Sequence, residues 1–158
     1  MPPFAPLIAS IESFARTAPS PAALQQFIVR RIAGSLPSYN WVGFYMLDPD
    51  DPETLILGPF AGAATEHVRI PVSRGLCGAA VAQGQTIVVD DVAADPRYLA
   101  CSLETRSEIV VPIRACGKIV GEIDIDSHTS AAFGPEDRAF LEQCAALVGA
   151  FFERTSKR

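Results

Sequence analysis

Two apolar stretches near the end of the chain, 107–114 and 118–127, constrain the fold more than any other feature. Apolar and polar residues alternate in the second stretch, so in a strand Asp124 and Asp126 point to one face while two isoleucines point to the other. Carboxylates are costly on a strand face unless solvent or a ligand receives them. The alternation therefore predicts either a strand with one face in water or a strand that lines a site.

The turn between the two stretches decides whether Glu108 shares the face of Asp124 and Asp126, because a shift of one residue turns every side chain of a strand to the other face. A two-residue turn at 116–117 puts Glu108 on the opposite face. A three-residue turn at 115–117, with glycine in the left-handed position, sets Glu108 directly across from Asp124. We predict the three-residue turn.

Carboxyl groups that face each other across two strands destabilise the pair unless a cation, a ligand or a shared proton compensates their charge. If Glu108 and Asp124 lie together as predicted, at least one of them should have a raised pKa. Such a carboxyl can donate a proton near neutral pH, so the arrangement predicts a general acid.

The four cysteines have no CxxC pair and no histidine spacing typical of zinc, so we expect no metal site. Cys77 falls in the first turn of an expected helix, where the helix dipole and Arg74 favour a thiolate. Cys101 lies in a polar, irregular segment that a compact fold tolerates mainly when it lines a site. Either cysteine could instead be a small buried hydrophobe, an interpretation that is stronger for Cys116 and Cys144.

The rest of the chain predicts helices at both ends of a run of strands. Helical spacing of apolar residues covers 4–16, 21–36 and 135–155, and a short helix of small residues ends near Gly84. Further strands are expected at 41–47, 54–57, 67–71 and 86–89. We predict one α+β domain over 1–158 with a central, mainly antiparallel sheet of about six strands. It comprises a helical segment 1–37, a sheet core with the pocket 38–128, and a terminal helix 135–155.

Composition excludes several partners. The chain has 13 basic and 18 acidic residues without a basic cluster, so nucleic acid is not expected. No apolar run approaches the ~18 residues that cross a bilayer, and the first residues lack the basic start of a signal peptide, which predicts a cytoplasmic protein without a membrane partner. The apolar content of the terminal helices would allow a homodimer.

Two aromatic residues have alternative interpretations. Trp41, at the start of a strand, belongs either to the core or to the wall of a small-molecule pocket. His67 is either an incidental polar residue or a base. Arg69 and Arg74 are expected to be surface charges or partners of the acidic groups.

Seven short motifs, taken together, resemble the free methionine-R-sulfoxide reductases, which are single GAF domains. They run in unbroken order from about residue 39 to residue 152 and keep the intervals that separate Cys101, Glu108 and Asp124. The motifs are Asn40–Tyr45, Leu57–Phe60, Val68–Pro71, Gly75–Gly78, Ala100–Cys101, Ser107–Pro112 and Asp124–Ser127. The resemblance implies a GAF-like fold, with the terminal helices on one side of the sheet and a ligand pocket formed by loops and a short helix on the other.

The resemblance also implies a thiol reaction on free methionine sulfoxide. Cys101 matches the nucleophile, which attacks the sulfoxide sulfur as thiolate and becomes a sulfenic acid. The acidic residues match the groups that bind the amino acid and protonate or polarise the sulfoxide oxygen. By this resemblance Cys101, Cys77, Glu108 and Asp126 are catalytic, and the substrate is bound by Trp41, Tyr45, Glu108, Asp124 and Asp126.

One position departs from the family pattern. The usual resolving cysteine precedes the Val68–Pro71 motif, and here that position is His67, which cannot form a disulfide. Either Cys77 must then resolve Cys101 or an external thiol must do so. The resemblance implies no cofactor beyond an external reductant such as thioredoxin. The alternative function is a non-catalytic GAF module that senses a small amino-acid-like ligand.

Overall fold

The computed structural model describes residues 3–99 and 103–156. Its centre is a six-stranded sheet in the order β3-β2-β1-β6-β5-β4, and every neighbouring pair of strands is antiparallel. The strands are β1 (Trp41–Asp48), β2 (Asp51–Ala61), β3 (Arg69–Pro71), β4 (Ile87–Val89), β5 (Ser107–Ala115) and β6 (Lys118–Ser127). The sequence prediction of an α+β domain around such a sheet is confirmed.

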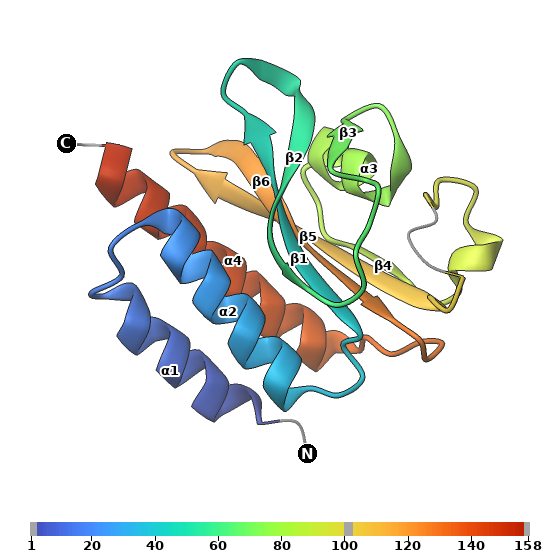
Figure 1. The fold of residues 1–158 in the computed structure, drawn as a ribbon, viewed down its shortest axis with the longest axis horizontal. Coiled ribbons are helices and arrows are strands. Elements are labelled where there is room, and N and C mark those ends of the chain that lie inside the picture. Colours follow the sequence, from blue (N-terminus) through green and yellow to red (C-terminus); the bar gives the residue numbers. More distant parts are fainter. Residues whose placement is uncertain (1–2, 100–102, 157–158) are drawn as a thin grey trace.

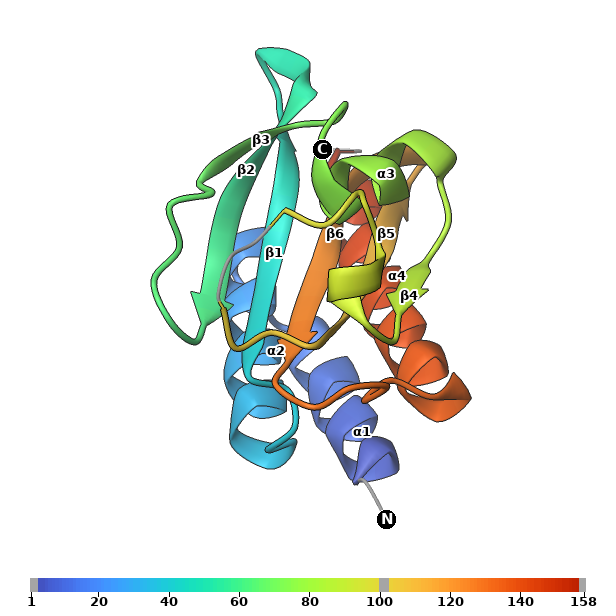
Figure 2. The ribbon, with the colours of Figure 1, turned by 90° about the vertical axis from the view of Figure 1, so that its right-hand side faces the viewer.

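Helices cover the two faces of the sheet unequally. The helices α1 (Phe4–Ala15), α2 (Pro21–Ser35) and α4 (Pro135–Ser156) lie together on one face, as Figure 1 shows. The short helix α3 (Gly75–Gln83) lies on the other face, and the 3₁₀ turn Val92–Ala94 follows β4 (Figure 2). None of the helices in the described part of the chain has the length and apolar character needed to span a membrane.

The helix-covered face holds the larger apolar core. Ile109, Ile123 and Ile125 point from the sheet into this core and are fully buried. They pack against apolar residues that all three helices contribute, among them Ile28 and Leu141. Burying a side chain of this size stabilises the fold by about 1.5 to 3 kcal/mol. The period-two alternation of β6 therefore fixes which face of the sheet receives the helices.

The ends of two elements follow from local hydrogen bonds. Helix α2 begins as predicted, because the Ser20 side chain accepts a hydrogen bond of 3.1 Å from the Ala23 amide and proline occupies the first helical position. The hairpin β1–β2 has a shorter turn than the gap between the predicted strands 41–47 and 54–57. The Asp48 side chain accepts a hydrogen bond of 2.9 Å from the Asp50 amide, which closes the turn early, and β2 begins at Asp51.

The predicted three-residue turn between β5 and β6 is wrong. Ala115 pairs with Lys118, so the turn has two residues, and both have positive φ angles, 52° at Cys116 and 76° at Gly117. The register then shifts by one residue, because Val120 has no partner on β5. This bulge reverses the consequence of the short turn.

After the bulge, Glu108 pairs with Asp126 and Val110 pairs with Asp124. Glu108 therefore shares the face of the β6 carboxylates, as we expected, but it lies across from Asp126 and not across from Asp124. A two-residue turn was expected to separate these residues between the two faces, and the extra residue in β6 prevents this.

We predict that Cys116→Asn stabilises the protein by about 1 kcal/mol, because asparagine adopts the left-handed conformation required at Cys116 with less strain. The free energy of unfolding in urea measures the effect. Cys116→Ala, which also removes the thiol but keeps an unfavourable residue type, should show no such gain. Equal free energies of unfolding for both variants would contradict strain at this position.

Candidate active site

The sheet face opposite the long helices carries a cluster of carboxyl groups, which we call the acid cluster. It consists of Glu108 on β5 with Glu122, Asp124 and Asp126 on β6. Each of these four residues is between 0% and 5% exposed. Strand alternation places the three β6 residues along one face, with about 7 Å between each residue and the next. The interpretation of a strand with one face in water is therefore wrong, because the carboxyl groups are buried.

Helix α3 covers part of the acid cluster and brings a thiol to it. Cys77 lies in the first turn of this helix and is buried. Its sulfur and one oxygen each of Glu108 and Asp124 lie within 4.8 Å of one another. These groups line a cavity of about 10 Å³, roughly the volume that one water molecule requires, together with Ile70, Gly75, Leu76 and Leu99.

Strand β1 contributes the aromatic side of the site. Trp41 pairs with Asp126, Gly43 with Asp124 and Tyr45 with Glu122. A Cβ atom at Gly43 would lie 2.3 Å from the Trp41 ring, so glycine is what allows this ring to lie across the strand. The predicted wall at Trp41 is thus placed beside the acid cluster.

Both aromatic side chains are held by backbone carbonyl groups. The Trp41 indole donates a hydrogen bond of 3.0 Å to the Ala63 carbonyl, and its ring stacks on Tyr45 with centroids 6.2 Å apart. The Tyr45 hydroxyl donates a bond of 2.8 Å to the carbonyl of His67. Tyr45 is fully buried below Trp41, so it supports the wall of the site.

A second cavity, of about 90 Å³, opens beside the acid cluster and is lined by Asp126 of this cluster and by Trp41. Its other lining residues come from the segments that flank β1, β2, β5 and β6, namely Asn40, Ala63, Thr65, Glu104, Thr105 and His128. This cavity extends the site away from Cys77. A ligand that is larger than one water molecule therefore has space on the Trp41 side.

Burial governs the protonation of the acid cluster. Burial raises the pKa of Glu122, Asp124 and Asp126, and the charge of Asp124 raises the pKa of the other two further. No basic side chain in the described part of the chain forms an ion pair with these three residues. The site therefore retains protons that carboxyl groups in water would release.

The expectation that Cys77 is a thiolate is wrong for this structure. Burial raises its pKa well above the usual value, and the negative charges of Asp124, Glu122 and Glu108 raise it further. Arg74, which was expected to favour the thiolate, is exposed to solvent. Desolvation and repulsion therefore outweigh the helix dipole, which contributes typically 0.3 to 1 kcal/mol.

Two further site residues are Cys101, which the sequence predicted, and Glu122, which it did not. Cys101, the predicted nucleophile, lies outside the described residues. Glu122 was missed, although it lies two residues before Asp124 and so continues the same alternation. Of the remaining cysteines, Cys116 is exposed, and Cys144 is buried in the core of α4, where burial raises its pKa to about 12.

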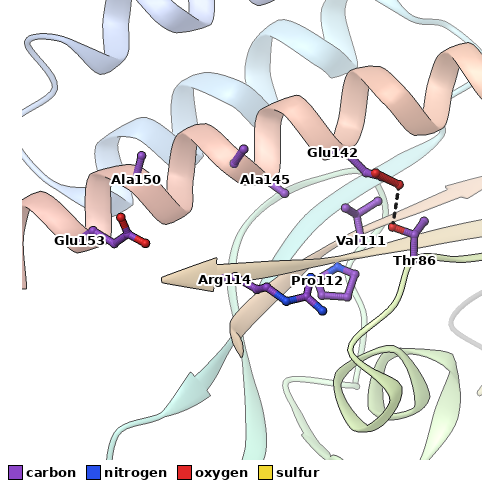
Figure 3. Close-up of a pocket in the computed structure, with 9 residues that line it drawn as sticks. Thr86, Val111, Pro112, Arg114, Glu142, Ala145, Ala150 and Glu153 are labelled. Carbon is purple, nitrogen blue, oxygen red and sulfur yellow. Dashed lines mark hydrogen bonds between the residues drawn. The ribbon is translucent and has the colours of Figure 1, made fainter. Parts of the chain in front are cut away.

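A larger surface groove, of about 400 Å³, lies between α4 and strand β5 (Figure 3). Glu142 accepts a hydrogen bond of 3.1 Å from Thr86 across it, and Arg114 lies on its floor. Of the predicted site residues that the structure describes, none lines this groove. Its size alone does not make it a site for the chemistry that the sequence predicts.

The sequence and the fold match known proteins. The sequence profile of the GAF domain covers residues 22–151. Free methionine-R-sulfoxide reductase of Escherichia coli is 43% identical over 113 residues, which are 72% of this chain and 66% of that protein. The structure of free methionine-R-sulfoxide reductase from Neisseria meningitidis in complex with its substrate has a TM-score of 0.90 and 35% identity, and covers 97% of this chain and 91% of the other. This chain belongs to the free methionine-R-sulfoxide reductase family of GAF domains.

The family also includes relatives whose names state no activity. Protein YtsP of Bacillus subtilis is 48% identical over 114 residues, which are 72% of this chain and 69% of that protein. The matched region thus spans about two thirds of the length of both relatives. The resemblance found in the sequence motifs is confirmed for the family and for the GAF fold.

The close spacing of Cys77, Glu108 and Asp124 would also allow a metal ion to bind all three. Thiolate and carboxylate groups are ligands of zinc. Binding would require the Cys77 thiol to lose its proton, which burial and the neighbouring carboxylates oppose.

We predict that the protein becomes less stable as pH rises from about 5 to 8. A buried acid with a raised pKa keeps its proton in the native state but loses it on unfolding, so its stabilisation is present below the unfolded pKa and is lost as pH rises toward the folded pKa. The loss is at most about 1.4 kcal/mol per pH unit for each such carboxyl. Asp124→Asn should reduce this slope and be more stable than wild type at pH 8.

Urea unfolding at several pH values measures this dependence. Asp50→Asn, a change at an exposed aspartate in the β1–β2 turn, provides the control and should leave the slope unchanged. Parallel pH profiles for the wild type and Asp124→Asn would show that Asp124 does not retain its proton in the native state.

Proposed function

We propose that this protein reduces free L-methionine (R)-S-oxide to L-methionine. The observation that carries the proposal is the buried acid cluster beside Cys77 and Trp41, in a chain of the free methionine-R-sulfoxide reductase family. The sulfoxide oxygen leaves only if it is neutralised. Buried carboxyl groups that keep their protons near neutral pH can supply that proton.

In the proposed first step, the Cys101 thiolate attacks the sulfoxide sulfur. Glu108 and Asp126 protonate or polarise the sulfoxide oxygen. The sulfur–oxygen bond of the substrate breaks, methionine leaves as the thioether, and Cys101 retains the oxygen as a sulfenic acid. The substrate sulfur gains the two electrons that the sulfur of Cys101 loses, so this step needs no cofactor or metal.

The same side chains would bind the amino acid. A substrate ammonium group compensates the charge of the acid cluster, which has no basic partner at Glu122, Asp124 or Asp126 among the described residues. The face of Trp41 offers an apolar wall for the methyl end of the side chain. Both groups lie on adjacent strands, which keeps their spacing fixed.

Recycling requires a second thiol. We propose that Cys77 attacks the sulfenic acid of Cys101 and that a thioredoxin-like reductant opens the resulting disulfide. His67 stands where the family pattern has its usual resolving cysteine, so Cys77 takes over this role. The position of Cys77 at the acid cluster supports the proposal, since the sulfenic acid would form there.

We predict turnover of one epimer only. Incubation with the R epimer of free methionine sulfoxide and dithiothreitol should release methionine, and the S epimer should release none, because the oxygen must face the acid cluster. Methionine is quantified by chromatography, and prior treatment with a chelator should not change the rate. Absence of turnover in a folded protein, together with tight binding of methionine or its sulfoxide, would favour the sensor function instead.

We predict different losses for the two cysteine variants. Cys101→Ser should abolish methionine release, because no sulfur remains to accept the oxygen. Cys77→Ser should release methionine in a single turnover but lose turnover linked to thioredoxin and NADPH. Cys144→Ser, a change in the α4 core, serves as a control for loss of a thiol. Equal loss of the first turnover in both site variants would contradict the assignment of roles.

A further inference from the structure

Cys77, Glu108 and Asp124, which we call the triad, come from three elements that are far apart in the sequence. Helix α3 carries the cysteine and packs on both β5 and β6, which carry the two acids. One atom from each member of the triad lies within 4.8 Å of the other two. Sequence motifs for metal sites depend on short spacings between ligands, so the sequence could not reveal this arrangement.

Close backbone packing positions Cys77 in the triad. The amide of the next residue, Gly78, donates a hydrogen bond of 3.1 Å to the Arg74 carbonyl. A Cβ atom at Gly78 would lie 2.6 Å from the carbonyl oxygen of Val72, so the first turn of α3 can lie against the segment after β3 only because this residue is glycine. This contact fixes the backbone that carries the thiol.

Asp124 supplies a buried oxygen without a partner. The residue is 1% exposed, and its Oδ1 atom has no hydrogen-bond partner among the described residues. Within the same part of the chain, no basic side chain forms an ion pair with Asp124. A buried acceptor of this kind costs stability unless a ligand binds it. Asp124 lines the cavity of about 10 Å³ beside Cys77, so a ligand in this cavity would reach it.

We infer that the triad binds a zinc ion and that this ion excludes the substrate from the site. Zinc accepts thiolate and carboxylate ligands together, whereas magnesium and calcium prefer oxygen ligands alone. The exclusion rests on the proposed function, in which Glu108 and Asp124 bind the amino acid. An ion held by these two acids leaves neither of them for the substrate ammonium group.

The dimensions of the triad suit a single ion. Zinc lies about 2.3 Å from a sulfur ligand and about 2.0 to 2.2 Å from a carboxylate oxygen, so ligands at tetrahedral angles are about 3.5 Å apart. The triad atoms lie within 4.8 Å of one another and need to approach by at most about 1.3 Å. The adjoining cavity of about 10 Å³ admits one ion or one water molecule but not an amino acid.

Zinc reverses the electrostatics that keep the Cys77 thiol protonated. Burial and the nearby carboxylates raise the pKa of this thiol in the metal-free protein. A bound divalent cation becomes the largest local charge, and a thiol that coordinates it loses its proton. The sulfur–hydrogen bond breaks, the proton passes to solvent and a zinc–sulfur bond forms, without electron transfer. The metal-free protein is the active form, and zinc inhibits it.

Cadmium, which accepts the same ligands as zinc, reports the metal–thiolate bond directly by its ultraviolet charge-transfer band. The measurement uses a protein with Cys101→Ser and Cys116→Ser, in which the remaining thiols are Cys77 and the core residue Cys144. We expect the band with one equivalent of cadmium, its loss on addition of zinc, and no effect of magnesium. Adding Cys77→Ser should abolish the band. A band that persists in this triple variant, or no band in the double variant, would overturn the inference.

Calorimetric titration with zinc tests the carboxylate ligands in the same double variant. Asp124→Asn should weaken zinc binding at least about tenfold, the loss that even indirect partners of a metal ligand typically cause. Asp126→Asn is the matched control, because it changes a buried acid of the same cluster that is not a member of the triad. Equal losses in the two variants would show general attraction to the acid cluster instead of coordination. Melting curves confirm that each variant is folded.

Exclusion of the substrate is measured as methionine release in a single turnover of the R sulfoxide, without added thiol. For each protein, the rate in zinc is compared with its own rate without zinc. Wild type should lose at least about tenfold of its rate at a zinc concentration that leaves Cys77→Ser nearly unaffected. Equal inhibition of both proteins would overturn the exclusion. The proposed function fails by a different result, namely no methionine released without zinc, and the cadmium band then tests the metal site by itself.

Discussion

The transfer of four carboxyl groups from water into one face of the sheet is the constraint on which the rest of this structure depends. Burying a charged carboxylate without a partner costs several kcal/mol, so Glu122, Asp124 and Asp126 retain protons instead. Burial of apolar side chains on the opposite face of the same strands offsets that cost. Isoleucines that alternate with the acids along β6 pack under three helices, and each contributes about 1.5 to 3 kcal/mol.

Much of the fold follows from patterns that the sequence states locally. The terminal helices, the alternation of β6 and the location of the acids on one face could all be predicted, because each depends on residues a few positions apart. The partner of Glu108 could not. It depends on a two-residue turn with Cys116 at positive φ and on a bulge at Val120, and these two irregularities compensate each other.

Burial is the other quantity that the sequence did not reveal. Cys77 looked activated when only its place in the first helical turn was considered, but its pKa depends on the strands below it, which the chain supplies later. Glu122 was overlooked because the two aspartates already formed a recognisable motif, and a glutamate at a strand position is ordinarily exposed. The family pattern predicted which residues form the site, whereas the ionisation of these residues depends on the three-dimensional packing.

The acid cluster links the two halves of the proposed cycle through its protons. Reduction of the sulfoxide consumes a proton at the departing oxygen, and attack by Cys77 releases one from the thiol. Groups in water would exchange both with solvent, but the cavity at Cys77 holds roughly one water molecule. A proton released at Cys77 therefore stays within reach of the carboxyl groups of Glu108 and Asp124, which lie beside the thiol. Retention of protons in the acid cluster lowers the stability of the ligand-free protein. The same retained protons serve both chemical steps.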